Sequence, residues 1–175
     1  MKKFSYKELD SILHGKQIYR RNEYSFDFLP DNHDELKELI GAMGTTSLSI
    51  GTLQIEISIE NRKLLYVWGY HPYFNWKTAS ILEPEAFLGS VTLSPKHKLE
   101  PGVSLAVAED EKWQTFHDAN SGCIVVTRYE DFLTGTCIKI ADDCTIELKG
   151  NSLFSLVLHV EMVDKVASPL PHNVN

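Results

Sequence analysis

"LQIEISIE", residues 53–60, alternates apolar and polar side chains without exception. In a β-strand successive side chains point to opposite faces, so a period of two separates the apolar residues from the polar ones. Leu53, Ile55, Ile57 and Ile59 are expected to face a core, and the residues between them to face solvent. The stretch therefore predicts a half-buried strand and a fold that contains a sheet.

A second strand is predicted directly after the first. Asn61 and Arg62 lie at a turn, and "KLLYVWGY" (63–70) returns from it. Both faces of this strand are apolar, which is typical of a central strand that is covered on both sides. The pattern predicts that Trp68 is a core ring and that Gly69 leaves room for a neighbouring segment.

More short strand patterns follow, with few helical patterns between them. "ADD" (141–143) is short and polar enough to join two of these strands as a hairpin, and residues 108–122 fit either a short helix or a long loop. The predicted strands cover 87–93, 103–107, 123–129, 136–140, 144–148 and 153–162.

Helical signals are found near the N-terminus. "SYKE" (5–8) has the spacing of a capping box, and apolar residues then fall on one face up to Gly15. "NHDE" (32–35) repeats this device with Asn32 as the cap, and apolar residues at helical spacing continue up to Gly44. Two amphipathic helices are therefore expected.

Together these patterns predict an α+β fold. A parallel sheet needs a crossover helix between successive strands, and no such helices are predicted after residue 53. We expect a single, mostly antiparallel sheet of six or more strands with the two N-terminal amphipathic helices packed on it. Residues 1–165 are expected to form one domain, and 166–175, with two prolines and no periodicity, a flexible C-terminal tail.

Composition limits the class of protein and the cellular location that we expect. The chain has 175 residues, of which 43% are hydrophobic and 23% charged, as in ordinary globular domains. Neither a long apolar run nor a secretory h-region is present, so a cytoplasmic location without a membrane partner is expected. The three cysteines have no metal-binding spacing and are predicted to be buried, reduced thiols.

The negative charge is concentrated in one window. The formal net charge is −7, and residues 100–147 hold ten acids but only three bases. An acidic region of this kind disfavours nucleic acid as a partner and favours a basic protein. The alternative interpretation is a solvated acidic surface that keeps the protein soluble.

No sequence motif identifies a catalytic centre. Phosphate-binding loops, dinucleotide fingerprints and nucleophile elbows are absent, and no histidine lies at metal-ligand spacing from another histidine or a cysteine. His117 and Asp118 could form a base with its orienting carboxylate, but neighbouring strand residues point to opposite faces. We therefore predict no catalytic residues, no metal and no cofactor.

The segment "YVWGYHPYFNW" (66–76) is unusually rich in rings. After Tyr70 the alternation stops at Pro72, so the later rings are expected on a loop. Loop rings either pack over the core or stay exposed as recognition groups. Both alternatives remain open, and as recognition groups these rings are candidate anchors for a protein partner.

The chain resembles the small immunity proteins of bacterial contact-dependent inhibition and related polymorphic toxin systems. The resemblance lies in a short, acidic chain without a catalytic motif, in the segment 66–76, and in the late strands "TCIKI", "CTIEL" and "LFSLVLHVEM". It implies a cytoplasmic antidote, not an enzyme, that binds a cognate toxin domain, commonly a basic nuclease.

Ring placement and charge together define a predicted partner-binding set. The alternative function is a hydrolase that binds a small molecule or carbohydrate in an aromatic-lined cleft. The predicted partner-binding residues are Tyr73, Phe74, Trp76, Glu109, Asp110, Glu111, Asp118, Glu130 and Asp131.

Overall fold

The strand predicted from strict alternation is present. The computed structural model describes residues 1–109 and 112–164. In it, β5 (Leu53–Ser58) buries its leucine and isoleucines completely and leaves Gln54 and Glu56 partly exposed. It forms an antiparallel hairpin with β6 (Leu64–Tyr70). The alternating sequence and the antiparallel return are both confirmed.

This hairpin belongs to a seven-stranded sheet. Its ladders are antiparallel except at the two edges, where short parallel pairings are formed with β15 and β9. The strand order is β15 (Glu161–Val163), β2 (Gly15–Arg20), β3 (Ser25–Pro30), β6, β5, β4 (Thr45–Ile50) and β9 (Leu105–Ala106).

An eight-stranded sheet lies opposite. Its centre is formed by the late strands of the chain, which pair in antiparallel fashion. The strand order is β1 (Phe4–Glu8), β8 (Phe87–Leu93), β12 (Thr136–Ala141), β13 (Cys144–Lys149), β14 (Ser152–His159), β11 (Cys123–Thr127), β10 (Gln114–Asp118) and β7 (Lys77–Thr78).

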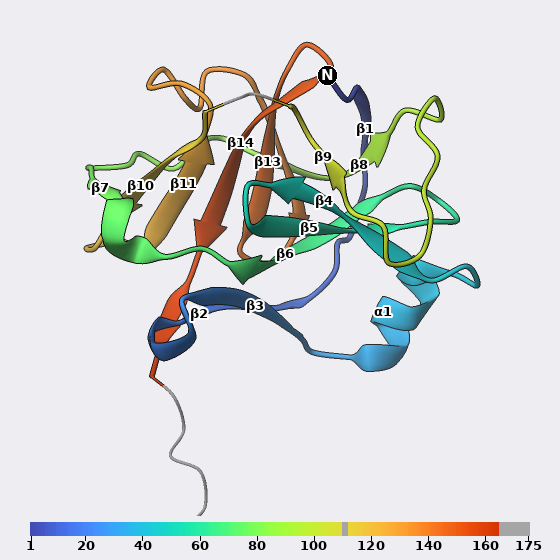
Figure 1. Cartoon of the computed structure of the whole chain (residues 1–175), viewed down its shortest axis with the longest axis horizontal. Coiled ribbons are helices and arrows are strands. Elements are labelled where there is room, and N and C mark those ends of the chain that lie inside the picture. The colour runs from blue at the N-terminus through green and yellow to red at the C-terminus, as the bar shows by residue number, and fades with distance from the viewer. Residues whose placement is uncertain (110–111, 165–175) are drawn as a thin grey trace, which may run out of the picture.

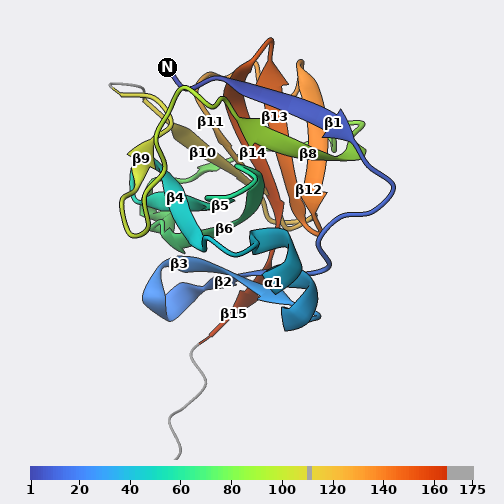
Figure 2. The ribbon, with the colours of Figure 1, turned by 90° about the vertical axis from the view of Figure 1, so that its right-hand side faces the viewer.

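The two sheets enclose one apolar core (Figures 1 and 2). Side chains of both sheets contribute to a single cluster, for example Ile55 and Val67 from one sheet and Ile146 and Leu156 from the other. The outer face of β11 and β14 is covered separately by a small cluster around Ile81. The strands of the eight-stranded sheet are thus buried on both faces at its centre.

The predicted α+β fold with one sheet and two helices is wrong. Within the described residues the fold is mostly β, with two sheets and one α-helix. The predicted first helix is instead β1, whose residues pair with β8 from Phe4 opposite Leu93 to Glu8 opposite Gly89. Ladder hydrogen bonds to a distant strand therefore replace the local capping box that Ser5 and Glu8 could have formed.

The second predicted helix is present but shorter. It is α1 (His33–Ile40), and the side chain of Asn32 caps it by accepting hydrogen bonds from the amides of Asp34 and Glu35. Asn61 and Ser58 donate side-chain hydrogen bonds to the carbonyls of its last turn. The helix is therefore fastened at both ends, although none of its residues is fully buried.

Several of the later strand predictions are also confirmed. Residues 87–93 form β8 with the predicted bounds, and the predicted hairpin at 141–143 joins β12 to β13. The predicted strand at 103–107 is reduced to the two residues of β9. In the described part of 108–122, that is 108–109 and 112–122, the regular element is the strand β10, so the predicted alternatives of a helix or a long loop are not found there.

Trp68 is not a core ring. Its side chain is 38% exposed, and its indole N–H donates a hydrogen bond of 2.6 Å to Glu56. Trp68 and Tyr70 are exposed on one face of β6, Tyr66 is partly buried beside Phe28, and Val67 is fully buried. The prediction of a central ring on this strand is therefore corrected.

Cys123, Cys137 and Cys144 are buried free thiols, as predicted. Burial raises the pKa of Cys123 and Cys137 to about 11 and that of Cys144 to about 12. No helix in the described part of the chain has the length and apolar character needed to cross a membrane. The predicted C-terminal tail, 166–175, lies outside the described residues.

Candidate binding site

The aromatic segment is divided between the core and the surface. Its short 3-10 helix η2 (Tyr73–Asn75) carries Tyr73 and Phe74, and Trp76 follows directly after it. Trp76 is partly buried, and its ring stacks on Phe26 at a centroid distance of 5.9 Å with an interplanar angle of 16°. Packing and exposure therefore both occur within one stretch of sequence.

The exposed rings form one continuous surface. Tyr24, which follows the 3-10 helix η1 (Arg21–Glu23), lies 5.0 Å from Phe74, 5.7 Å from Tyr73 and 6.4 Å from Tyr70 between ring centroids. Phe74 is 66% exposed, Tyr70 50% and Tyr73 42%. These rings, together with Trp68, are called the aromatic surface.

Carboxylates lie next to this surface. A hollow of about 430 Å³ is bordered by Glu23, Asp27 and Glu56 and shares Trp68 with the aromatic surface. Its cation is Arg20, which is 3.1 Å from Asp27 in an ion pair. We call this feature the acidic hollow.

Tyr66 reports on the electrostatics of the acidic hollow. Burial raises its pKa to about 12, and the negative charges of Glu56 and Asp27 act in the same direction. Negative charge disfavours the tyrosinate and favours a cation. The three carboxylates outnumber the one arginine, so the hollow carries net negative charge.

The predicted acidic residues do not share one surface. Asp118 is buried, and its carboxylate accepts hydrogen bonds from the amides of Ile81, Asn120 and Ser121. The Ile81 hydrogen bond is the largest of the influences that lower the pKa of Asp118. Asp118 therefore fastens two chain segments, and its burial leaves little of the carboxylate for a partner to contact.

The other predicted acids are in different situations. Glu130 is exposed and lies 3.7 Å from the ammonium group of Lys77, and Asp131 pairs with Lys149 at 3.5 Å. Glu109 is exposed at a hollow that also involves the N-terminal residues. Asp110 and Glu111 lie outside the described residues.

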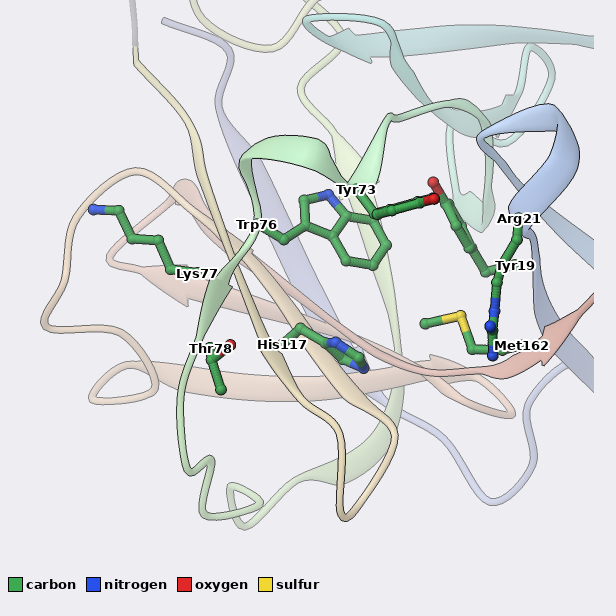
Figure 3. A pocket seen from close by; sticks show the side chains of 8 residues that line it. All are labelled: Tyr19, Arg21, Tyr73, Trp76, Lys77, Thr78, His117 and Met162. Atoms are coloured by element: carbon green, nitrogen blue, oxygen red, sulfur yellow. The ribbon is translucent and has the colours of Figure 1, made fainter.

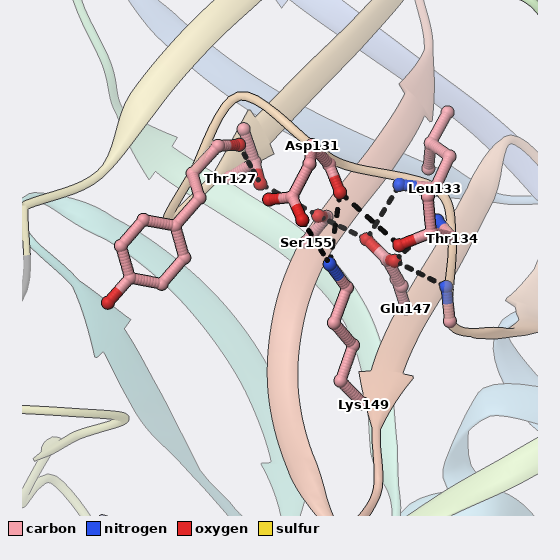
Figure 4. Close-up of polar contacts among 9 residues, drawn as sticks. Thr127, Asp131, Leu133, Thr134, Glu147, Lys149 and Ser155 are labelled. Carbon is pink, nitrogen blue, oxygen red and sulfur yellow. Dashed lines mark hydrogen bonds and ion pairs between the residues drawn. The ribbon is translucent and has the colours of Figure 1, made fainter.

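A buried carboxylate holds the loop that carries Glu130 and Asp131 (Figure 4). Glu147 is fully buried and accepts hydrogen bonds from the amides of Leu133, Thr134 and Gly135 at 2.8 to 3.0 Å. The hydroxyl of Ser155 donates a further hydrogen bond of 2.5 Å to it. Four donors satisfy this carboxylate, so it has a structural role in fixing the loop.

A cavity of about 300 Å³ opens beside η2 (Figure 3). Tyr73 lines it and also belongs to the aromatic surface, so the two features adjoin. The cavity is lined by Tyr19, Arg21, Tyr73, Trp76, Lys77, Thr78, His117 and Met162.

Two histidines near the cavity are held in the neutral form. Burial lowers the pKa of His71 to about 4, and the ring lies 2.7 Å from the hydroxyl of Thr115. Burial also lowers the pKa of His117, while Asp118 opposes this shift. Neither ring carries positive charge at neutral pH.

The histidine and carboxylate considered as a catalytic base pair, His117 and Asp118, are not brought together. His117 and Asp118 point to different surroundings, because Asp118 is engaged by backbone amides and His117 lines the cavity. The part of the chain that the structure describes contains no group of three or more His, Cys, Asp or Glu side chains able to hold a metal ion.

Sequence reasoning missed most of the residues that adjoin the predicted rings. One signal was available for Trp68 and Tyr66, because hairpin partners share a face and Gln54 and Glu56 lie opposite them. The others come together through distant strands. The missed residues are Tyr19, Arg21, Glu23, Tyr24, Asp27, Glu56, Tyr66, Trp68, Tyr70, Lys77, Thr78, His117 and Met162.

No protein-family model and no curated protein matches the chain.

Proposed function

We propose that this chain is a cytoplasmic binding protein of the immunity type, which neutralises a basic toxin domain by contact through the aromatic surface. The observation that carries the proposal is that exposed rings meet around Tyr24, while Glu23, its neighbour in the chain, borders the acidic hollow. Tyr70, Tyr73 and Phe74 are large, exposed and in mutual contact through Tyr24.

Exposed rings in contact with one another are suited to a protein interface. Tyrosine and tryptophan are enriched among residues that contribute most to binding, since each buries a large area at low cost in conformational entropy. Scattered exposed apolar residues are ordinary, whereas a contiguous group is characteristic of interaction sites. The grouping around η2 is of the second kind.

The acidic hollow makes this interface favour a positively charged partner. Glu23, Asp27 and Glu56 border it, and the whole chain has a net charge of −7. Opposite charge steers diffusional encounter, and desolvated rings then slow dissociation. A basic partner would use both effects. Blocking of the toxin by occlusion requires no catalytic group in this chain.

Binding kinetics test the proposal. The ligand is the variable C-terminal domain of a large exported protein encoded beside this chain, immobilised on a surface. We expect the double variant Tyr70→Ala, Phe74→Ala to dissociate at least about tenfold faster, because buried rings contribute after contact. Tyr6→Ala is the matched control: this ring is also exposed but lies on β1, outside the aromatic surface.

Charge variants separate the acidic hollow from the acidic sequence window. Glu23→Lys is expected to slow association and to weaken its dependence on salt. Glu109→Lys is the comparison in the window 100–147. The proposal fails if the neighbouring domain does not bind, or if the ring variants dissociate like the parent. A larger effect of Glu109→Lys would move the interface away from η2.

A further inference from the structure

The cavity beside η2 offers flat apolar walls. Tyr19 is completely buried, and its ring centroid lies 4.9 Å from that of Trp76. Trp76 meets Tyr73 at 6.4 Å and His117 at 5.8 Å, both nearly edge to face. Tyr73 and Trp76 line this cavity without being fully buried, so a planar apolar group inside it would contact their ring surfaces.

The charged groups of this cavity are all positive. No Asp or Glu is among its lining residues, which include Arg21 and Lys77. Lys77 is already engaged, because its ammonium group donates a hydrogen bond of 2.6 Å to Gln114 and lies near Glu130. Figure 3 shows it directed away from the other lining side chains.

Arg21 is the cation that remains available. Its guanidinium makes no hydrogen bond or ion pair with another side chain among residues 1–109 and 112–164. In Figure 3 its side chain lies on the same side as Tyr19 and extends toward Met162. A guanidinium presents paired N–H donors that match the two oxygens of a carboxylate.

Two uncharged polar groups complete the wall. Burial keeps His117 neutral, so that its imidazole offers one donor and one acceptor. The hydroxyl of Thr78 is the second such group. Neither side chain has a hydrogen-bond partner within the described residues, so both are available to orient a polar substituent.

From these observations we infer that the cavity is a binding site for a small aromatic carboxylate, with the ring against Tyr73 and Trp76, which Tyr19 supports from behind, and the carboxylate on Arg21. The volume of about 300 Å³ is at the lower limit of ligand pockets, which favours a ligand of one or two fused rings. The site is a small-molecule site beside the proposed protein interface and does not depend on the identity of the toxin.

Calorimetric titration at pH 7.5 tests the inference with three probes of known structure. The first is 4-hydroxyphenylacetate, the second is its primary amide, and the third is a nucleoside monophosphate. The acid is expected to bind at least about tenfold more tightly than the amide, because only the acid forms a charge-assisted pair with Arg21. The nucleotide is expected to bind more weakly than the acid because of its size.

One arginine variant and one lysine variant test where the carboxylate of the ligand binds. Arg21→Gln is expected to remove the preference for the acid over the amide while leaving amide binding within about twofold. Lys77→Gln is the comparison: this cation lines the same cavity, but its ammonium group is engaged by Gln114 and Glu130, so its loss is expected to reduce the preference less than Arg21→Gln does.

Each contrary result overturns a defined part of the inference. Absence of binding by the acid, or equal affinity of acid and amide, removes the carboxylate site. A loss of preference in Lys77→Gln equal to that in Arg21→Gln removes the assignment of Arg21. Tighter binding of the nucleotide than of the acid replaces the aromatic carboxylate by a phosphate ligand.

Discussion

At the scale of single residues, the most consequential side chain is a buried carboxylate. Glu147 has no exposed surface, and its carboxylate accepts hydrogen bonds from three backbone amides and one hydroxyl group. Such a group is stable inside a protein only because every oxygen is satisfied. Its partners belong to the loop before β12 and to β14, so one side chain connects parts of the chain that are distant in sequence.

Replacement of Glu147 by glutamine should therefore be costly. The amide group of glutamine turns one acceptor into a donor that faces backbone N–H groups, so Glu147→Gln should lower the free energy of unfolding by about 2–4 kcal/mol. Denaturant unfolding measures this loss. Glu130→Gln is the control, because this carboxylate is exposed and should change stability by less than about 0.5 kcal/mol. Equal stability of the two variants would contradict the role of Glu147.

His71 predicts how stability depends on pH. Its pKa in the folded protein is about 4, whereas an unfolded imidazole titrates near 6.5. As the pH falls from about 6.5 to 4, His71 binds a proton in the unfolded chain but stays neutral in the folded one. The free energy of unfolding therefore decreases by up to about 1.4 kcal/mol per pH unit because of this group. The full contribution is present above about pH 6.5.

Urea unfolding of the parent and of His71→Gln between pH 7.5 and 4.5 checks this dependence. Glutamine keeps a polar group near Thr115 but does not titrate, so the variant should show a shallower loss of stability with acid. Identical pH profiles would show that His71 does not provide the difference.

Trp68 shows what a residue pattern can and cannot provide. Its strand was correctly predicted, but its burial was not, because an apolar face was taken to be a covered face. The register of the β5–β6 hairpin places Trp68 opposite Gln54 and Tyr66 opposite Glu56. Cross-strand partners share a face, so the polar alternation of β5 already indicated that these rings point outward.

At the scale of elements, α1 depends on its cap more than longer helices do. It has eight residues, none fully buried, so packing contributes less to it than to a core helix. Asn32→Ala removes the acceptor for two amides and should cost about 1 kcal/mol.

Chemical denaturation compares this variant with Asp31→Ala, in which the neighbouring exposed residue is changed. The side chain of Asp31 makes no hydrogen bond within the described residues, so its loss should be nearly neutral. Similar costs in both variants would mean that the cap does not limit the stability of α1.

Local patterns predicted the elements best where local pairing forms them. The β5–β6 and β12–β13 hairpins are joined by short turns, and both were predicted from sequence. The misassigned element, β1, pairs instead with β8, some eighty residues later in the chain. A capping-box pattern depends on two neighbouring side chains. It therefore carries no information about pairing with a strand so distant in the sequence.

At the scale of the whole molecule, two sheets rather than one determine where the binding features lie. The cavity beside η2 combines residues from the start of the chain, such as Tyr19, with His117 and Met162. Such a combination requires β15 to join β2 and β7 to join β10 in parallel pairings. Neither pairing has a short-range signature, which is why the rings of 73–76 were predicted as candidates but the other walls were not.

The three buried cysteines have a consequence for how the molecule moves. They lie on β11, β12 and β13, and a disulfide-exchange reagent reacts with a thiolate that these thiols do not form near neutral pH. Modification must therefore wait until the sheet opens, and its rate in native buffer measures how often that happens. At pH 8 we expect labelling to be far slower than in concentrated urea, and labelling at the urea rate would contradict thiol burial. Mass spectrometry then gives the labelling rate of each cysteine. Three different rates would show that the strands open separately, and one common rate would show that the sheet opens as a unit.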